Sequence, residues 1–167
     1  MPGLFSFPDP VNDTSARAVA TGVVGMATAA VVADQPWILF PLTYGFAARV
    51  ATGPTLSPLG QLATRVVTPL IPVEHTFSPG PPKRFAQSVG LMMSTAALVL
   101  HYGLGRRKAA KGLLAALILA ASLEAFLGVC LGCKIFSVAV RAGLVADSVC
   151  EECTDIGSRP SPGAETG

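Results

Sequence analysis

The uncharged run from Phe85 to Gly105 is the feature that most constrains how this chain can fold. It contains no Asp, Glu, Lys or Arg, and as a helix it would rise about 31 Å, close to the ~30 Å hydrocarbon core of a bilayer. A segment of this length and polarity is typical of a transmembrane helix. The composition agrees, because 51% of the residues are hydrophobic and only 13% are charged, which is far from the composition of soluble domains.

Three further apolar segments extend this prediction to an all-α, polytopic membrane protein with about four transmembrane helices. They are separated by short polar turns and by a loop, residues 54–84, that holds seven of the prolines. We therefore expect an N-terminal segment, a membrane domain, a short C-terminal segment with two cysteines, and a disordered tail rich in Pro, Gly, Ser and Glu. In order, these parts are residues 1–17, 18–141, 142–156 and 157–167, with spans at about 18–33, 37–53, 85–105 and 112–133.

The distribution of Lys and Arg predicts the orientation in the membrane. With four spans, the N-terminal segment, the second loop and the C-terminal region lie on one side and carry eight basic residues, whereas the turn "RRKAAK" on the other side carries four. The side with more basic residues is expected to be cytoplasmic. The sequence thus predicts a multi-pass protein of a bacterial plasma membrane with both termini in the cytoplasm. Oligomerisation stays open, and no basic stripe with interleaved aromatic residues indicates nucleic-acid binding.

All four cysteines belong to Cys-x-x-C pairs, Cys130 with Cys133 and Cys150 with Cys153. The full pattern, C-x2-C-x16-C-x2-C, falls within zinc-ribbon spacing, and four thiolates would complete a tetrahedral zinc site. Alternatively, each pair is a dithiol that exchanges electrons or sulfur with a soluble partner. The spacing leaves both chemistries open. It makes a purely packing role less attractive, because paired spacing occurs twice.

The surroundings of the two pairs distinguish them as nucleophiles. If the fourth span is one continuous helix, Cys130 and Cys133 lie at its C-terminal end, where the helix dipole disfavours a thiolate and the adjacent Lys134 favours one. The second pair is flanked by Glu151 and Glu152, whose charges disfavour a thiolate. Cys130 and Cys133 are therefore the better redox candidates.

Glu124 is the one acid inside the fourth apolar segment. It would lie about 18 Å along a helix that starts at Gly112, near the middle of the bilayer, where an ionised carboxylate costs a few kcal/mol. We expect it to be protonated or paired with a polar group of a neighbouring helix. On a continuous helix it projects from the face opposite the cysteines, so the acid and the thiols would not form one cluster. A proton-relay role in a small transporter is an alternative, but the sequence lacks the inverted repeats that would support it.

Five stretches of the chain resemble a known membrane family. They are "FPDPVNDTSARAVA", "YGFAARVATGPTLSPLG", "GPPKRFAQSVG", "LEAFLGVCLGCKIF" and "VCEEC", and together they are similar to the family catalogued as domain of unknown function 4395. The resemblance implies a small integral membrane protein with a Cys-Leu-Gly-Cys motif and no established reaction. Domains similar to it occur beside thioredoxin-like or sulfur-transfer proteins, so the resemblance implies a partner of that kind and favours the redox interpretation.

Together these features predict the membrane component of a thiol-disulfide or sulfur-handling system, with the bilayer and a thioredoxin-like or sulfur-transfer protein as partners. The alternative is a membrane scaffold whose four cysteines hold a structural zinc. A small transporter that uses Glu124 is the third class of function. The sequence contains no Ser-His-Asp set, phosphate loop or histidine-rich metal cluster, so we do not expect a conventional active site.

Overall fold

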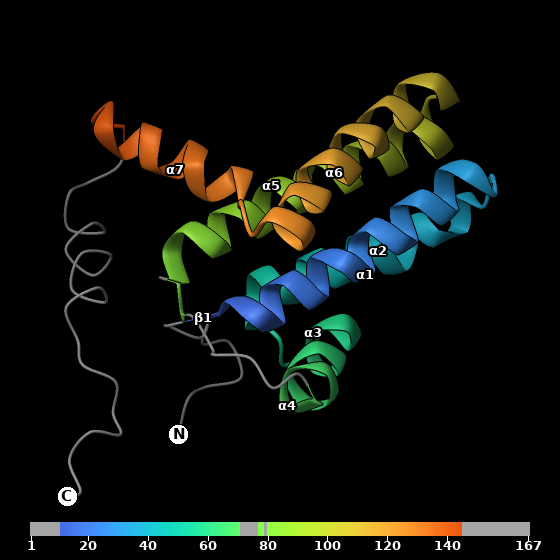
Figure 1. Cartoon of the computed structure of the whole chain (residues 1–167). Coiled ribbons are helices and arrows are strands. Elements are labelled where there is room, and N and C mark those ends of the chain that lie inside the picture. The colour runs from blue at the N-terminus through green and yellow to red at the C-terminus, as the bar shows by residue number, and fades with distance from the viewer. Residues whose placement is uncertain (1–10, 71–76, 79, 145–167) are drawn as a thin grey trace, which may run out of the picture.

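Four long helices lie side by side in the computed structural model, which describes residues 11–70, 77–78 and 80–144 (Figure 1). This confirms the all-α prediction, apart from a two-residue antiparallel pairing of β1 (Val11–Asn12) with β2 (Phe77–Ser78). The long helices are α1 (Asp13–Val32), α2 (Leu39–Thr52), α5 (Gly80–Leu98) and α6 (Arg107–Leu127). The short elements are η1 (Pro36–Ile38), α3 (Pro58–Leu62), η2 (Ala63–Val67), α4 (Thr68–Leu70), η3 (Val99–Gly103) and α7 (Leu131–Arg141).

Helix α1 begins five residues before the first expected span because Asn12 caps it. The Asn12 side chain accepts hydrogen bonds from the amides of Thr14 at 2.9 Å and Ser15 at 3.4 Å, and so satisfies two of the unpaired N–H groups of the first turn. Asp13 adds a negative charge beside the positive end of the helix dipole. The polar first turn of α1 thus becomes part of the helix, and its side chains are available to the site described below.

The core of the bundle is built from small and medium apolar side chains. Helix α1 packs mainly on α6, and α2 packs mainly on α5. Close approach of α2 and α5 requires Gly90, because a Cβ there would lie 2.3 Å from Cε1 of Phe46. The buried apolar side chains of this core include Val19, Val23, Ala27, Ala30, Leu39, Leu42, Phe46, Ala97, Ala110, Leu114, Leu117 and Ala121.

Two of the described helices, α1 and α6, are long and apolar enough to cross a membrane. The outer surface of the bundle is also rich in large apolar side chains. Exposed examples come from all four long helices and include Val32, Phe40, Tyr44, Met92, Leu119 and Phe126. A surface of this kind is unusual for a soluble monomer.

The fourth long helix differs from the sequence prediction at its end. We expected one helix up to residue 133, and that expectation is wrong, since α6 ends at Leu127 and α7 begins at Leu131. Between them, Gly128 adopts the left-handed conformation with φ of +67°, which glycine tolerates best and which ends helices. In Figure 1, α7 leaves the end of α6 and runs beside the first part of α5, on which it packs.

Candidate thiol site at the helix break

The break between α6 and α7 is held by local hydrogen bonds. The Gly128 amide donates to the Glu124 carbonyl at 3.1 Å, and the Val129 amide donates to the Leu123 carbonyl at 3.1 Å. The first of these bonds, with the left-handed glycine, is the αL type of helix end. The backbone therefore turns at a defined point before it reaches the first cysteine.

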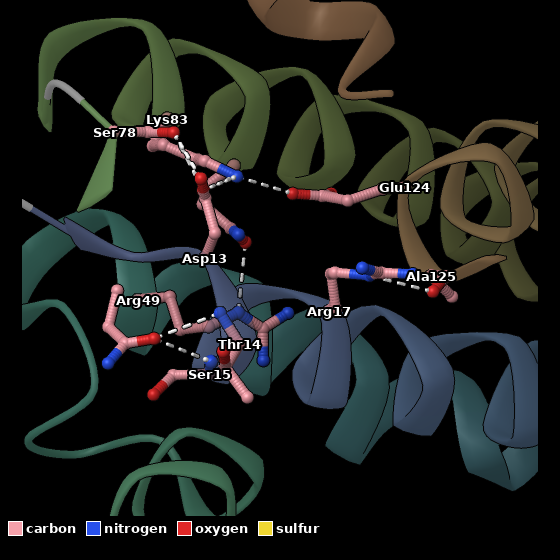
Figure 2. Close-up of polar contacts among 11 residues, drawn as sticks. Asp13, Thr14, Ser15, Arg17, Arg49, Ser78, Lys83, Glu124 and Ala125 are labelled. Atoms are coloured by element: carbon pink, nitrogen blue, oxygen red, sulfur yellow. Dashed lines mark hydrogen bonds and ion pairs between the residues drawn. The ribbon is translucent and has the colours of Figure 1, made fainter. Parts of the chain in front are cut away.

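Arg17 of α1 completes this helix end from a distant part of the sequence. Its Nε donates to the Ala125 carbonyl at 3.1 Å (Figure 2). Its Nη2 donates to the Phe126 carbonyl, also at 3.1 Å. These carbonyls belong to the last turn of α6, where no intrahelical amide reaches them. A positive charge at the C-terminus of a helix also interacts favourably with the helix dipole. Arg17 thus ties the start of α1 to the end of α6.

The first cysteine lies at the start of a helix instead of at the end of one. Cys130 is the N-cap residue of α7, with φ of −79° and ψ of 107°, and its carbonyl accepts the Lys134 amide at 3.1 Å. Cys133 follows in the first turn. The sign of the dipole effect is therefore opposite to our expectation from the sequence, because a helix N-terminus favours a thiolate.

The two thiols differ in acidity. Hydrogen bonding from the Cys133 thiol is the main cause that lowers the pKa of Cys130, against the opposing effects of burial and of the Glu124 charge. The same hydrogen bond, together with burial, raises the pKa of Cys133. Both cysteines are free thiols and are partly buried. The pKa of Cys130 is therefore lower than that of Cys133.

A buried lysine joins two carboxylates beside this site. Lys83 Nζ lies 3.0 Å from Glu124 Oε1 and 3.1 Å from Asp13 Oδ1 (Figure 2). The Lys83 side chain is 9% exposed, and those of Glu124 and Asp13 are 17% and 26% exposed. Ser78 also donates its hydroxyl to Asp13 at 2.7 Å. Glu124 is thus paired across helices, which is one of the two states that we expected for it.

The break also brings Glu124 and Cys130 to one cavity. Both residues line a space of about 250 Å³ between the four long helices, whose other walls are mainly apolar. We expected the acid and the thiols to lie on opposite faces of one straight helix, but the break at Gly128 places Cys130 on the same cavity as Glu124, whereas Cys133 does not line it. The turn at Gly128 redirects the chain so that the start of α7 returns to the cavity.

Gly132, inside the Cys-Leu-Gly-Cys motif, lets α7 pack closely on α5. A Cβ at Gly132 would lie 2.5 Å from the Ala86 Cβ and 2.7 Å from the Ala86 Cα, closer than nonbonded carbon atoms can approach. Further along α7, the buried ring of Phe136 lies 5.6 Å from the ring of Phe85 on α5. These two contacts fix the first turn of α7, and with it the thiol pair, against α5.

The second cysteine pair, Cys150 and Cys153, lies outside the described residues. Within residues 11–70, 77–78 and 80–144, no group of three or more His, Cys, Asp or Glu side chains is placed to hold a metal ion. The four-cysteine zinc site therefore stays a prediction.

No sequence pattern identifies Asp13, Arg17 or Lys83 as parts of the site. In the sequence, Arg17 and Lys83 contribute only as charges to the predicted membrane orientation. One signal was available for Lys83. A buried acid such as Glu124 needs a cation nearby, and Lys83 lies in the first turn of α5. No comparable signal connects Arg17 with carbonyl groups that are more than a hundred residues away.

The structure defines a helical bundle with a reduced thiol pair at a helix break and a buried ion-pair cluster beside it. The chain belongs to the family described as domain of unknown function (DUF4395), whose profile matches residues 11–141. This confirms the resemblance seen in the sequence. The matched region contains Cys130, Cys133 and the three residues of the ion-pair cluster, and it ends before Cys150 and Cys153. No curated protein and no solved structure matches the chain.

Proposed function

We propose that this protein is a membrane component of a thiol-disulfide exchange system, with Cys130 as the attacking thiolate and Cys133 as the resolving thiol. The observation that carries the proposal is the position of Cys130 at the N-terminus of α7, with Cys133 in the first turn of the same helix. A dithiol in this position has one activated and one protonated sulfur, which is what stepwise exchange requires.

The membrane setting of the proposal rests on the shape and surface of the bundle. Helices α1 and α6 have the length and apolarity of spans, and α2 and α5 lie beside them with apolar side chains on the outside. We propose that all four cross the bilayer. The excess of basic residues on the side of the thiol site supports a cytoplasmic position for that site and for both termini.

The proposed reaction transfers two electrons from the dithiol to a disulfide of a soluble partner of thioredoxin-like or sulfur-transfer type. The Cys130 thiolate attacks one partner sulfur, and the other partner sulfur leaves as a thiolate that takes a proton from water. Cys133 then loses its proton to water and attacks the Cys130 sulfur. This step forms the Cys130–Cys133 disulfide and releases the second partner sulfur as a thiolate, which takes a proton from water, so the partner is reduced and this protein is oxidised.

The ion-pair cluster supports a thiolate at this position. Glu124 lines the same cavity as Cys130, and an unpaired carboxylate there would oppose a second negative charge. Lys83 lies 3.0 Å from that carboxylate and offsets its charge. Lys83 is therefore the group that balances the charge in this proposal, and its ion pair with Glu124 makes that carboxylate less suited to carry ions as a transporter would require.

The test uses the full-length protein, purified under reducing and metal-replete conditions and then mixed with oxidised thioredoxin. Cys133→Ser removes the resolving thiol, so Cys130 should remain joined to thioredoxin in a mixed disulfide that dithiothreitol releases. Cys130→Ser and the double variant are matched controls and should form no adduct. In alkylation with iodoacetamide at increasing pH, Cys130 should react at a lower pH than Cys133.

The same preparation tests the zinc alternative. One zinc per chain, lost equally in Cys→Ser variants at positions 130, 133, 150 and 153, would identify a structural metal site. Zinc in that ratio, together with the absence of any adduct from Cys133→Ser, would refute the exchange proposal.

A further inference from the structure

A second site lies around Arg49 of α2, away from the thiols. Arg49 is 4% exposed, and its guanidinium lies over the Phe46 ring at 4.6 Å from the ring centroid. Nε donates to Gln87 Oε1 at 2.9 Å, and Nη1 donates to Ser57 Oγ at 3.1 Å. Nη2 has no hydrogen-bond partner among the described residues. All the contacts found for this buried cation in the described part of the chain are therefore with neutral groups.

Such an arrangement is energetically unfavourable unless something else pairs with the charge. A guanidinium has five N–H donors and cannot lose its proton inside a protein. Buried charges are normally paired, and buried donors normally have acceptors. Among the described residues, the partly buried carboxylates at this end of the bundle, Asp13 and Glu124, are both bound to Lys83.

The space beside Arg49 can hold a partner. Arg49 lines a cavity of about 220 Å³, together with the polar residues Asn12, Ser15 and Thr64. Figure 2 shows Arg49 beside the first turn of α1, where Ser15 lies. The remaining wall comes from apolar side chains and from the glycine- and proline-containing turn after α2. This cavity shares no lining residue with the cavity of the thiol site.

We infer that the Arg49 cavity binds an oxyanion of the phosphate or carboxylate class. The free edge of a guanidinium matches such an anion with two parallel hydrogen bonds. The side-chain NH2 of Asn12, whose oxygen accepts the amides of α1, can donate a further one. The cavity is smaller than the ~300–1,000 Å³ of sites for drug-sized ligands, so it accepts a small anion or the phosphate of a lipid headgroup. The site does not depend on thiol exchange.

The test measures anion binding to the full-length, delipidated protein. Inorganic phosphate is titrated with thermal unfolding as the readout, and nanodiscs containing phosphatidylglycerol followed by native mass spectrometry report a retained lipid. For whichever anion binds, Arg49→Gln should raise the dissociation constant by about tenfold or more, because charge-assisted hydrogen bonds are lost. Arg65→Gln, at an exposed arginine of the neighbouring η2, should leave it unchanged. Dependence on phosphate indicates a soluble anion, and retained phosphatidylglycerol indicates a headgroup.

A second variant keeps the inference testable if Arg49→Gln does not fold. Ala16 lines the cavity on α1, and Ala16→Leu fills part of it while it leaves the guanidinium in place and suits a helix. This variant should also weaken binding. If neither phosphate nor phosphatidylglycerol binds to the unaltered protein, or if both variants bind as it does, the inference is wrong.

Discussion

The two ends of the bundle each contain a lysine–carboxylate ion pair, yet the pairs differ in what they can contribute. At the thiol end, Lys83 lies 3.0 Å from Glu124, and its side chain is 9% exposed. At the opposite end, Lys111 lies 2.8 Å from Asp34, with side chains that are 42% and 64% exposed. The shorter pair is the weaker one, because water screens exposed charges and already solvates them well. Burial, and not distance, decides the energetic role of each pair.

The two ends also differ in how the chain builds them. The Lys111 end is formed by short turns between consecutive helices, residues 33–35 and 104–106. The thiol end is assembled from distant segments, since Asp13, Lys83 and Glu124 come from α1, α5 and α6. Changes at the thiol end should therefore propagate between helices, whereas changes at the other end should remain local.

The largest effect should come from Lys83→Met. This change leaves Asp13 and Glu124 without their shared cation, and breaking a buried ion pair costs about 3 kcal/mol at the lower end of its usual range. The lower end applies because Asp13 keeps 26% of its side-chain exposure. The loss is measured as a decrease in the free energy of unfolding in detergent micelles.

Two controls sharpen this prediction. Lys108→Met removes an exposed lysine at the opposite end and should have little effect. Glu124→Gln should cost less than Lys83→Met, since Asp13 still pairs with Lys83. Equal losses for Lys83→Met and Lys108→Met would remove the distinction between the two ends.

A smaller effect is expected for Gly128→Ala at the helix break. A Cβ at Gly128 meets only Arg17, at 3.9 Å or more, so no clash occurs. The cost is conformational, about 1–2 kcal/mol for a non-glycine residue in the left-handed region. Gly112→Ala is the matched control within α6, because a Cβ there has open space and alanine favours a helix interior. The unfolding temperature of Gly128→Ala should be lower than that of the unaltered protein, and that of Gly112→Ala should be equal to it or higher.

The sequence predicted the fold class well because apolar segments and proline-rich connections leave few alternatives to a helical bundle. It did not predict the helix break, although its cause was visible. Gly128 stands inside an apolar run, and glycine in such a run indicates either close packing of two helices or a helix end. Only the three-dimensional surroundings of Gly128, where Arg17 donates to the free carbonyls of the last turn of α6, show that the helix ends there.

The thiol site shows the same limit. Spacing alone identified Cys130 and Cys133 as a pair, but their chemistry depends on which end of a helix they occupy. The sign of the dipole effect reverses across the three residues that separate Leu127 from Leu131. The partner of Glu124 was unpredictable in detail, since Lys83 and Asp13 approach it only after three helices have packed. A local pattern cannot specify contacts of that kind.

The smallest effect is expected for Asp34→Asn at the exposed end. Asp34 has φ of +51°, and Asn tolerates the left-handed region as Asp does, so the substitution removes the charge without adding strain. Lys111 lowers the pKa of Asp34 in the folded protein, mainly through a hydrogen bond. The pair therefore stabilises the fold above the unfolded pKa of about 3.9 and loses this contribution as the pH falls through the lower folded value. At neutral pH the shift in unfolding temperature should be small and should shrink further in high salt. A loss comparable to that of Lys83→Met would show that exposure does not set the strength of these pairs.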